Sequence, residues 1–187
     1  MTLAQIMTLA LRQLDEDPAD LAEYDDLFRM YANEGYQIVM RDYYKPREHF
    51  DFTTDEKGAA DITGRDIVRI VELRNALGMD VWFDLSVDGT TIYTREREKD
   101  LHAVAEIEVA PLARDMDVPL FPEWAHNVLV DYVCYRHLSS GNMGKQQRAQ
   151  FFLAQFHQGA RRIRPQGVGS VNRFKNLYAV TDARYTR

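Results

Sequence analysis

Residues 122–163, PEWAHNVLVDYVCYRHLSSGNMGKQQRAQFFLAQFHQGARRI, predict a pair of antiparallel helices around which the chain is organised. Pro122 suits the first helical position, where a missing N–H costs nothing. The next apolar residues recur at spacings of three and four, the period of one buried helical face: Trp124, Val128, Leu129, Tyr132, Val133 and Tyr135. Turn-forming residues at 139–142 then interrupt the pattern, so we expect helices over 122–140 and 144–163.

The second of these helices has its own apolar stripe and ends in basic residues. The stripe contains Ala149, Phe152, Phe156, Ala160 and Ile163. Arg161 and Arg162 fall in the last turn, where cations suit the carbonyl end of the helix dipole, and Pro165 stops the helix. We expect Phe156 to be buried between the two helices, with Trp124 or Val128 among its neighbours.

The first 44 residues predict two more helices, over 2–14 and 21–44. Thr2 suits the N-cap of the first helix, whose apolar face contains Leu3, Ile6, Met7, Ala10 and Leu14. The stripe of the second helix contains Leu27, Tyr31 and Ile38, with Tyr24, Phe28 and Met30 alongside. Gly35 weakens the centre of this helix by about 1 kcal/mol relative to alanine.

Between the two helical pairs, the apolar period changes to alternation, which predicts strands. Asp88-Gly89 is a strong hairpin signal, and a two-residue turn there places Leu85 opposite Ile92. Residues 48–109 therefore predict a small antiparallel sheet inserted into the helical core. The expected fold class is α+β: a four-helix core with this insertion, forming one domain over residues 1–165, followed by an extended C-terminal arm.

The composition limits the class of protein and its compartment. Of the 187 residues, 45% are hydrophobic, which predicts a folded core, and no run of apolar residues is long enough to predict a membrane span. The first residues lack the basic region of a secretory signal. Cys134 is the single cysteine, so an internal disulfide is excluded and a reducing cytoplasm is the expected place of synthesis.

The net charge of −6 hides a marked division along the chain. Ten of the 23 basic residues lie from Arg136 onward, where Asp182 is the single acid, and 28 of the 29 acids precede them. Seven acids and no base fall within residues 15–26. The arm over 166–187 interleaves aromatic residues with arginines, the types enriched at interface hot spots. We therefore expect the arm to bind a partner protein.

No sequence motif establishes an enzyme, a cofactor site or a metal site. Glu123-x-x-His126 has the spacing used in di-iron bundles, but no second copy is present, so a solvent-facing or interface pair is favoured. The histidines lack zinc-ligand spacing, Cys134 is expected to serve packing, and no phosphate loop or nucleophile elbow occurs. An acidic body without a compact basic face also argues against affinity-driven DNA binding.

The order of the expected elements resembles that of the head–tail adaptor (connector) proteins of tailed bacteriophages, including the tail tubular protein A group. Four segments carry the likeness: Met1–Leu14, Tyr31–Gly35, Thr91–Arg95 and, most clearly, Val118–Trp124. The last of these leads into residues 128–132 and the Gly141 turn. The resemblance covers residues 1–165 in layout.

The resemblance implies a non-enzymatic protein of the virion, made in the host cytoplasm and placed at the head–tail interface. Twelve copies would form a ring under the portal protein, offer a surface to tail nozzle or neck proteins, and line a channel that DNA passes without specific binding. No membrane partner is expected. The portal-binding residues would be Arg161, Arg162, Arg164, Arg173, Phe174, Lys175, Leu177, Tyr178, Arg184, Tyr185 and Arg187. A tail-completion or neck protein at another level of the virion, and a tail-associated hydrolase, are the alternatives.

Overall fold

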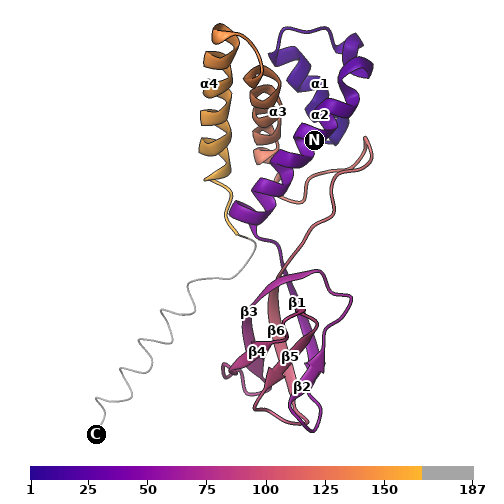
Figure 1. Ribbon diagram of the computed structural model, residues 1–187, viewed down its shortest axis with the longest axis vertical. Coiled ribbons are helices and arrows are strands. Elements are labelled where there is room, and N and C mark those ends of the chain that lie inside the picture. Colours follow the sequence, from indigo (N-terminus) through magenta and orange to yellow (C-terminus); the bar gives the residue numbers. More distant parts are fainter. Residues whose placement is uncertain (166–187) are drawn as a thin grey trace, which may run out of the picture.

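The apolar stripes of four helices meet in one lobe of the structure, a computed structural model that describes residues 1–165 (Figure 1). The helices are α1 (Leu3–Gln13), α2 (Leu21–Ile38), α3 (Asn127–Ser139) and α4 (Met143–Ala160). Short 3-10 turns, Pro18–Asp20 and Glu123–Ala125, precede α2 and α3. Six strands form the second lobe, so the mixed α+β class with four helices is confirmed.

Helix α1 begins with the predicted cap. The Thr2 hydroxyl accepts a hydrogen bond from the Gln5 backbone N–H at 3.4 Å, and the Gln5 side chain accepts one from the Thr2 N–H at 2.9 Å. This reciprocal pair is a capping box, which satisfies two N–H groups that a helix start leaves free. The whole predicted apolar face of α1 is buried.

Helices α3 and α4 form the predicted antiparallel pair, with Phe156 buried between them. The ring centroids of Phe156 and Tyr132 are 4.9 Å apart, and the full predicted stripe of α4 is buried. Trp124 was wrongly placed in the core: its exposed fraction is 61%. The reason is that Trp124 lies in the 3-10 turn before α3, where the helical phase of α3 does not apply.

The buried face predicted for α2 is wrong: the observed face is rotated from it about the helix axis. Leu27 and Met30 are exposed, whereas Phe28, Ala32 and Tyr36 are buried. The apolar residues of α2 allow more than one face, and the face with Ala32 and Gly35 lets α3 approach most closely. A Cβ atom on Gly35 would lie 2.8 Å from Tyr132 Cδ1, so this glycine permits the contact.

Helix α2 continues as one π-helical segment, Val39–Tyr44, before the chain enters the β lobe. The segment ends at Lys45, whose φ of 48° is left-handed and whose N–H donates to Met40 O at 2.8 Å. The predicted end of this helix at residue 44 is therefore confirmed.

The β lobe contains two antiparallel sheets instead of the predicted one. The first has the order β1-β6-β3, from Arg47–Thr53, Asp100–Ile107 and Ile67–Asn75, and the second has the order β2-β5-β4, from Ala59–Asp61, Thr91–Thr94 and Phe83–Leu85. The alternation of apolar and polar residues predicts strands but does not show which strands pair, so the division into two sheets could not be predicted. Apolar side chains from both sheets form a separate small core.

The predicted hairpin between β4 and β5 has the correct register but a wider turn. Leu85 pairs with Ile92 as expected. The Ser86 N–H donates to Thr91 O at 2.9 Å, so residues 87–90 form the turn. Gly89 adopts a φ of 71°, a conformation that glycine accepts without strain.

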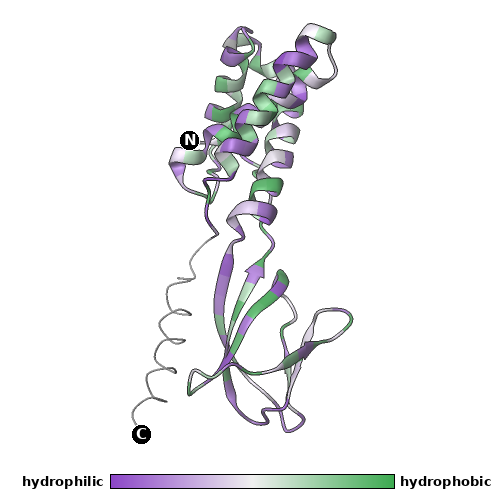
Figure 2. Ribbon diagram, turned by 90° about the vertical axis from the view of Figure 1, so that its left-hand side faces the viewer, coloured by the Kyte–Doolittle hydropathy of each residue, from purple (hydrophilic) through white to green (hydrophobic). Residues whose placement is uncertain are grey.

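Two segments of chain join the helical lobe to the β lobe: Lys45-Pro46, and the connector, defined here as residues 108–122 (Figure 1). Apolar residues gather inside the helical lobe and between the two sheets (Figure 2). Within residues 1–165, no helix is both long and apolar enough to cross a membrane. The predicted arm over 166–187 lies outside the described residues.

Candidate functional site

The predicted site residues that the structure describes lie together at the C-terminal end of α4. Arg161, Arg162 and Arg164 are exposed, while Ile163 between them is buried and holds the segment against the helical lobe. Within residues 1–165, none of the three arginines makes an ion pair. They therefore present uncommitted positive charge at the carbonyl end of α4, where the helix dipole favours it. The other predicted site residues, from Arg173 to Arg187, lie outside the described residues.

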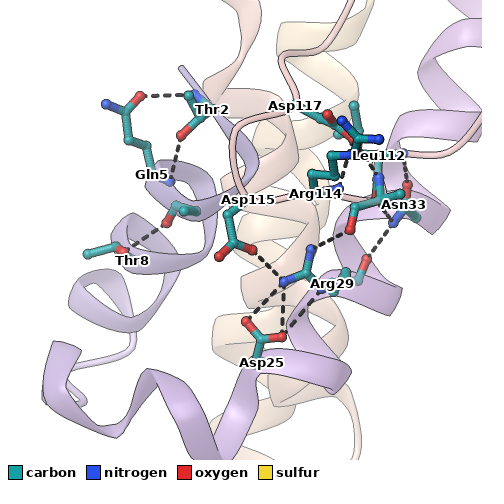
Figure 3. A network of polar contacts seen from close by, with 12 residues as sticks. Thr2, Gln5, Thr8, Asp25, Arg29, Asn33, Leu112, Arg114, Asp115 and Asp117 are labelled. Carbon is teal, nitrogen blue, oxygen red and sulfur yellow. Dashed lines mark hydrogen bonds and ion pairs between the residues drawn. The ribbon is translucent and has the colours of Figure 1, made fainter.

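The connector is fixed to α2 by charged and amide side chains (Figure 3). The guanidinium group of Arg29 donates to Asp115 Oδ1 at 2.6 Å, to Ala113 O at 3.0 Å and to Asp25 Oδ2 at 3.0 Å. Asn33 donates to Leu112 O at 2.9 Å and accepts from the Leu112 N–H at 2.7 Å. These contacts hold the connector in one conformation, although it has no regular secondary structure.

The connector also completes the start of α1. The carbonyl oxygens of Asp117 and Asp115 accept hydrogen bonds from the N–H groups of Leu3 and Ala4, at 2.8 and 3.1 Å. The carboxylate of Asp117 in turn accepts the N–H groups of Ala113 and Arg114 at 2.8 Å, which lowers the pKa of Asp117. Sequence reasoning missed this role because the partners lie more than one hundred residues apart.

Large apolar side chains project from the connector and the turn after it. Met116 has an exposed fraction of 76%, and Val118, Leu120 and Trp124 are each more than half exposed. The backbone that carries them is fixed by Arg29, Asn33 and α1, so their exposure is a property of an ordered surface. Exposed apolar side chains on an ordered backbone are typical of an interface with another protein when they adjoin one another on the surface.

The Glu123 and His126 pair does not form a metal site. His126 is buried: its Nε2–H donates to Phe121 O at 2.9 Å, and its Nδ1 lies 2.8 Å from the Met1 nitrogen. Burial lowers the pKa of His126, so the ring is neutral near pH 7. The Glu123 side chain is exposed to solvent. Within residues 1–165, no group of three or more His, Cys, Asp or Glu side chains could hold a metal ion.

Burial raises the pKa of two ionisable groups on α3, Cys134 and the half-buried Asp131. Cys134 is fully buried, and burial raises the pKa of its thiol to about 12, so the thiol is not reactive near neutral pH. Burial also raises the pKa of Asp131 to about 6. The carboxylate of Asp131 makes no hydrogen bond or ion pair within residues 1–165, but its charge lies close enough to the Cys134 thiol to raise the pKa of that thiol further.

Two histidines and one aspartate interact on the exposed face of the first sheet. His102 donates from Nδ1 to Asp51 Oδ1 at 2.7 Å, and His49 Nδ1 lies 3.3 Å from His102 Nε2. Asp51 and His102 are direct partners in the β1–β6 register. The spacing of the histidines along the sequence does not predict this cluster. A correct prediction of the β1–β6 pairing would have predicted it, because that pairing places Asp51 opposite His102.

No protein-family model matches this chain, and neither does any curated protein. The order of the elements, the exposed surfaces and the distribution of charge are therefore the features of the molecule that bear on its function.

Proposed function

We propose that this chain is a head–tail adaptor of a tailed bacteriophage: a structural ring subunit that joins the portal to tail or neck proteins and surrounds the passing DNA. The observation that carries the proposal is the order of elements: two N-terminal helices, a β lobe inserted after them, a connector that returns to the first helices, and a helical hairpin that packs on both. The segments that resemble the adaptor family include Val118–Trp124, which spans the end of the connector and the turn before α3.

The chemistry of the described side chains fits a structural role better than an enzymatic one. Within residues 1–165, His126, Cys134 and the half-buried Asp131 form no group that could hold a metal ion, and burial raises the pKa of the Cys134 thiol to about 12, so this nucleophile is unreactive near neutral pH. The features that reach the surface of the helical lobe include apolar side chains on the connector and arginines after α4, and the β lobe exposes apolar side chains such as Leu77, Trp82 and Val87. Apolar side chains and arginines are both recognition features of protein interfaces.

The charge distribution suits a ring around DNA. The first 135 residues hold 28 of the 29 acids, so a channel lined by this part of the chain repels the phosphate backbone and lets DNA slide. The arginines after α4 begin the basic and aromatic C-terminal segment. In the proposal, this segment binds complementary acidic grooves on the portal, with its aromatic side chains in apolar pockets.

The direct test is binding to the portal protein encoded by the same phage. We expect the full chain to sediment with portal, and a variant that lacks Gly167–Arg187 to lose this binding while keeping its melting temperature, because both hydrophobic cores lie within residues 1–165. Charge reversal at Arg161, Arg162 and Arg164 should weaken binding less, and the loss should depend on salt. Full-affinity binding by the truncated chain would contradict the assigned site, and binding to a tail protein alone would favour a neck or tail-completion role.

A further inference from the structure

We propose that neighbouring copies pack head to tail, with the outer face of α4 in one copy against the connector of the next. The inference rests on the proposed ring and deepens it by naming the two contact surfaces and their occupant, a second copy of this chain. We call the surfaces the α4 edge, formed by Met143, Gln147, Phe151, Ala154, Gln158 and Arg161, and the connector edge, formed by Met116, Val118 and Leu120 with the nearby acids Asp26, Asp115 and Asp117.

The α4 edge is a helical face with an apolar centre and no acid. The buried stripe of α4 packs on α3, and the residues half a turn away form the edge and are exposed. Phe151 has an exposed fraction of 59%, although Phe152 and Phe156 of the same helix are buried. Between Tyr132 and Pro165 the sequence has no Asp or Glu, and Arg161 forms the basic end of the face.

The connector edge has the complementary composition. Met116, Val118 and Leu120 are exposed on a backbone that Arg29 and Asn33 hold in place. Asp26 on α2 and Asp115 on the connector are exposed, and the acids of this region, Asp25, Asp26, Asp115 and Asp117, outnumber its bases, Arg29 and Arg114, although Arg29 pairs with Asp25 and Asp115. This apolar surface with a net excess of acids can therefore meet the apolar centre of the α4 edge and Arg161 at its end, and the opposite net charges favour that pairing over contact between two like edges.

The two edges lie on opposite sides of the helical lobe, which makes the contact heterologous. The connector runs along α1 and α2, and α4 packs on the far side of α3 (Figure 1). A contact that joins two different surfaces of one chain repeats from copy to copy, and it forms a closed ring when the rotation closes. Each copy carries both edges, so one kind of contact between copies covers the α4 edge of one copy and the connector edge of the next. A partner of another kind would need one surface complementary to the α4 edge and a different surface complementary to the connector edge.

Cysteine cross-linking in the full-length protein tests this assignment. We would make Met116→Cys and Phe151→Cys separately, mix the two proteins, and treat them with a short bis-maleimide. Native Cys134 is buried with a raised pKa, so the unmodified chain should give no background. In mixtures prepared with and without portal, the expected result is a covalent dimer, more of it with portal because the protein alone associates weakly, and none from either variant alone. Val68→Cys on β3, also well exposed, replaces Met116→Cys in the control mixture and should give no dimer.

The outcomes separate this inference from the proposed function. A dimer from Phe151→Cys alone would show a symmetric α4 contact and overturn the assignment. Rings assembled on portal that do not cross-link through the two edges would also overturn it, while leaving the adaptor role in place. Selective cross-linking in a protein that does not bind portal would support the two edges and contradict the adaptor role.

Discussion

Gly159 and Val128 meet where α4 packs on α3, and a Cβ atom on Gly159 would lie 2.5 Å from Val128 Cγ1. Gly35 plays the same part between α2 and Tyr132. At the scale of single residues, these two glycines decide how closely the helices pack, and the stripes of large apolar residues fill the space that remains. The sequence marks Gly35 only as a weak point of its helix, because helix propensity contains no information about a neighbour.

Phe156→Ala should lower the free energy of unfolding by about 3–5 kcal/mol, because it removes a fully buried ring and leaves a cavity beside Tyr132. Phe151→Ala is the matched control, since Phe151 is exposed on the same helix, and its effect should stay within about 0.5 kcal/mol. Chemical denaturation of both variants measures the difference. Equal losses would show that the packing around Phe156 is described incorrectly.

Gly159→Ala should destabilise the helical lobe by about 1–3 kcal/mol, because the added methyl group overlaps Val128. Helix propensity alone predicts the opposite sign, a gain of about 1 kcal/mol. Gly144→Ala provides the comparison, because its nearest neighbour, Asn142 Oδ1, would lie at an ordinary 3.7 Å. Thermal unfolding of the two variants should move the melting temperature down for Gly159→Ala and leave it level or raised for Gly144→Ala.

Asp131 should make the stability depend on pH. Burial raises its pKa from 3.8 to about 6, so the folded state holds the proton more tightly and loses stability as the carboxyl ionises across that interval. Asp131→Asn should therefore raise the free energy of unfolding at about pH 7.5 by about 1–2 kcal/mol, less than full burial would give because the carboxyl keeps some contact with water. At about pH 4 the variant and the native chain should be equally stable. The same gain at both pH values would rule out ionisation as the cause.

At the scale of elements, local sequence patterns predict most helices and strands but not the conformation of the connector. Apolar stripes predict the buried faces of α1 and α4, and they predict α3 as a helix but not its burial on several faces, which follows from its packing on α1, α2 and α4. They fail for α2, where Leu27 and Phe28 lie on competing faces and contact with α3 decides between them. Alternation predicts the strands but cannot assign six strands to two sheets. The ties of Arg29 and Asn33 to the connector are long-range hydrogen bonds that no local pattern contains.

Asn33→Ala tests how strongly the connector is held. The change leaves the N–H and carbonyl of Leu112 without their side-chain partner in a partly buried position, so we expect a loss of about 1–3 kcal/mol in unfolding free energy. Limited proteolysis should also become faster within the connector than elsewhere. Gln150→Ala, an exposed amide on α4, sets the baseline and should change neither measurement. Unchanged proteolysis in Asn33→Ala would show that other contacts suffice to fix the connector.

At the scale of the whole molecule, two lobes with separate cores are joined by two short segments, and the surfaces proposed for assembly belong to the helical lobe (Figure 2). Of the predicted portal-binding residues, the structure places Arg161, Arg162 and Arg164 together on the exposed end of α4. The apolar connector edge was not predicted as a site, because an isolated run such as Val118–Trp124 does not reveal which of its side chains point outward. In the sequence, the segment Val118–Trp124 was distinguished only by its resemblance to the adaptor family.

The central claim, that this chain is a portal-bound adaptor, is tested most directly by electron microscopy of the purified protein with and without the portal protein of the same phage. The acidic bodies repel one another, so the protein alone should be monomeric or weakly associated. With portal, class averages should show a ring of twelve copies that shares the portal axis. Portal particles that carry no added ring at saturating protein, or stable rings at micromolar concentration without portal, would contradict the account.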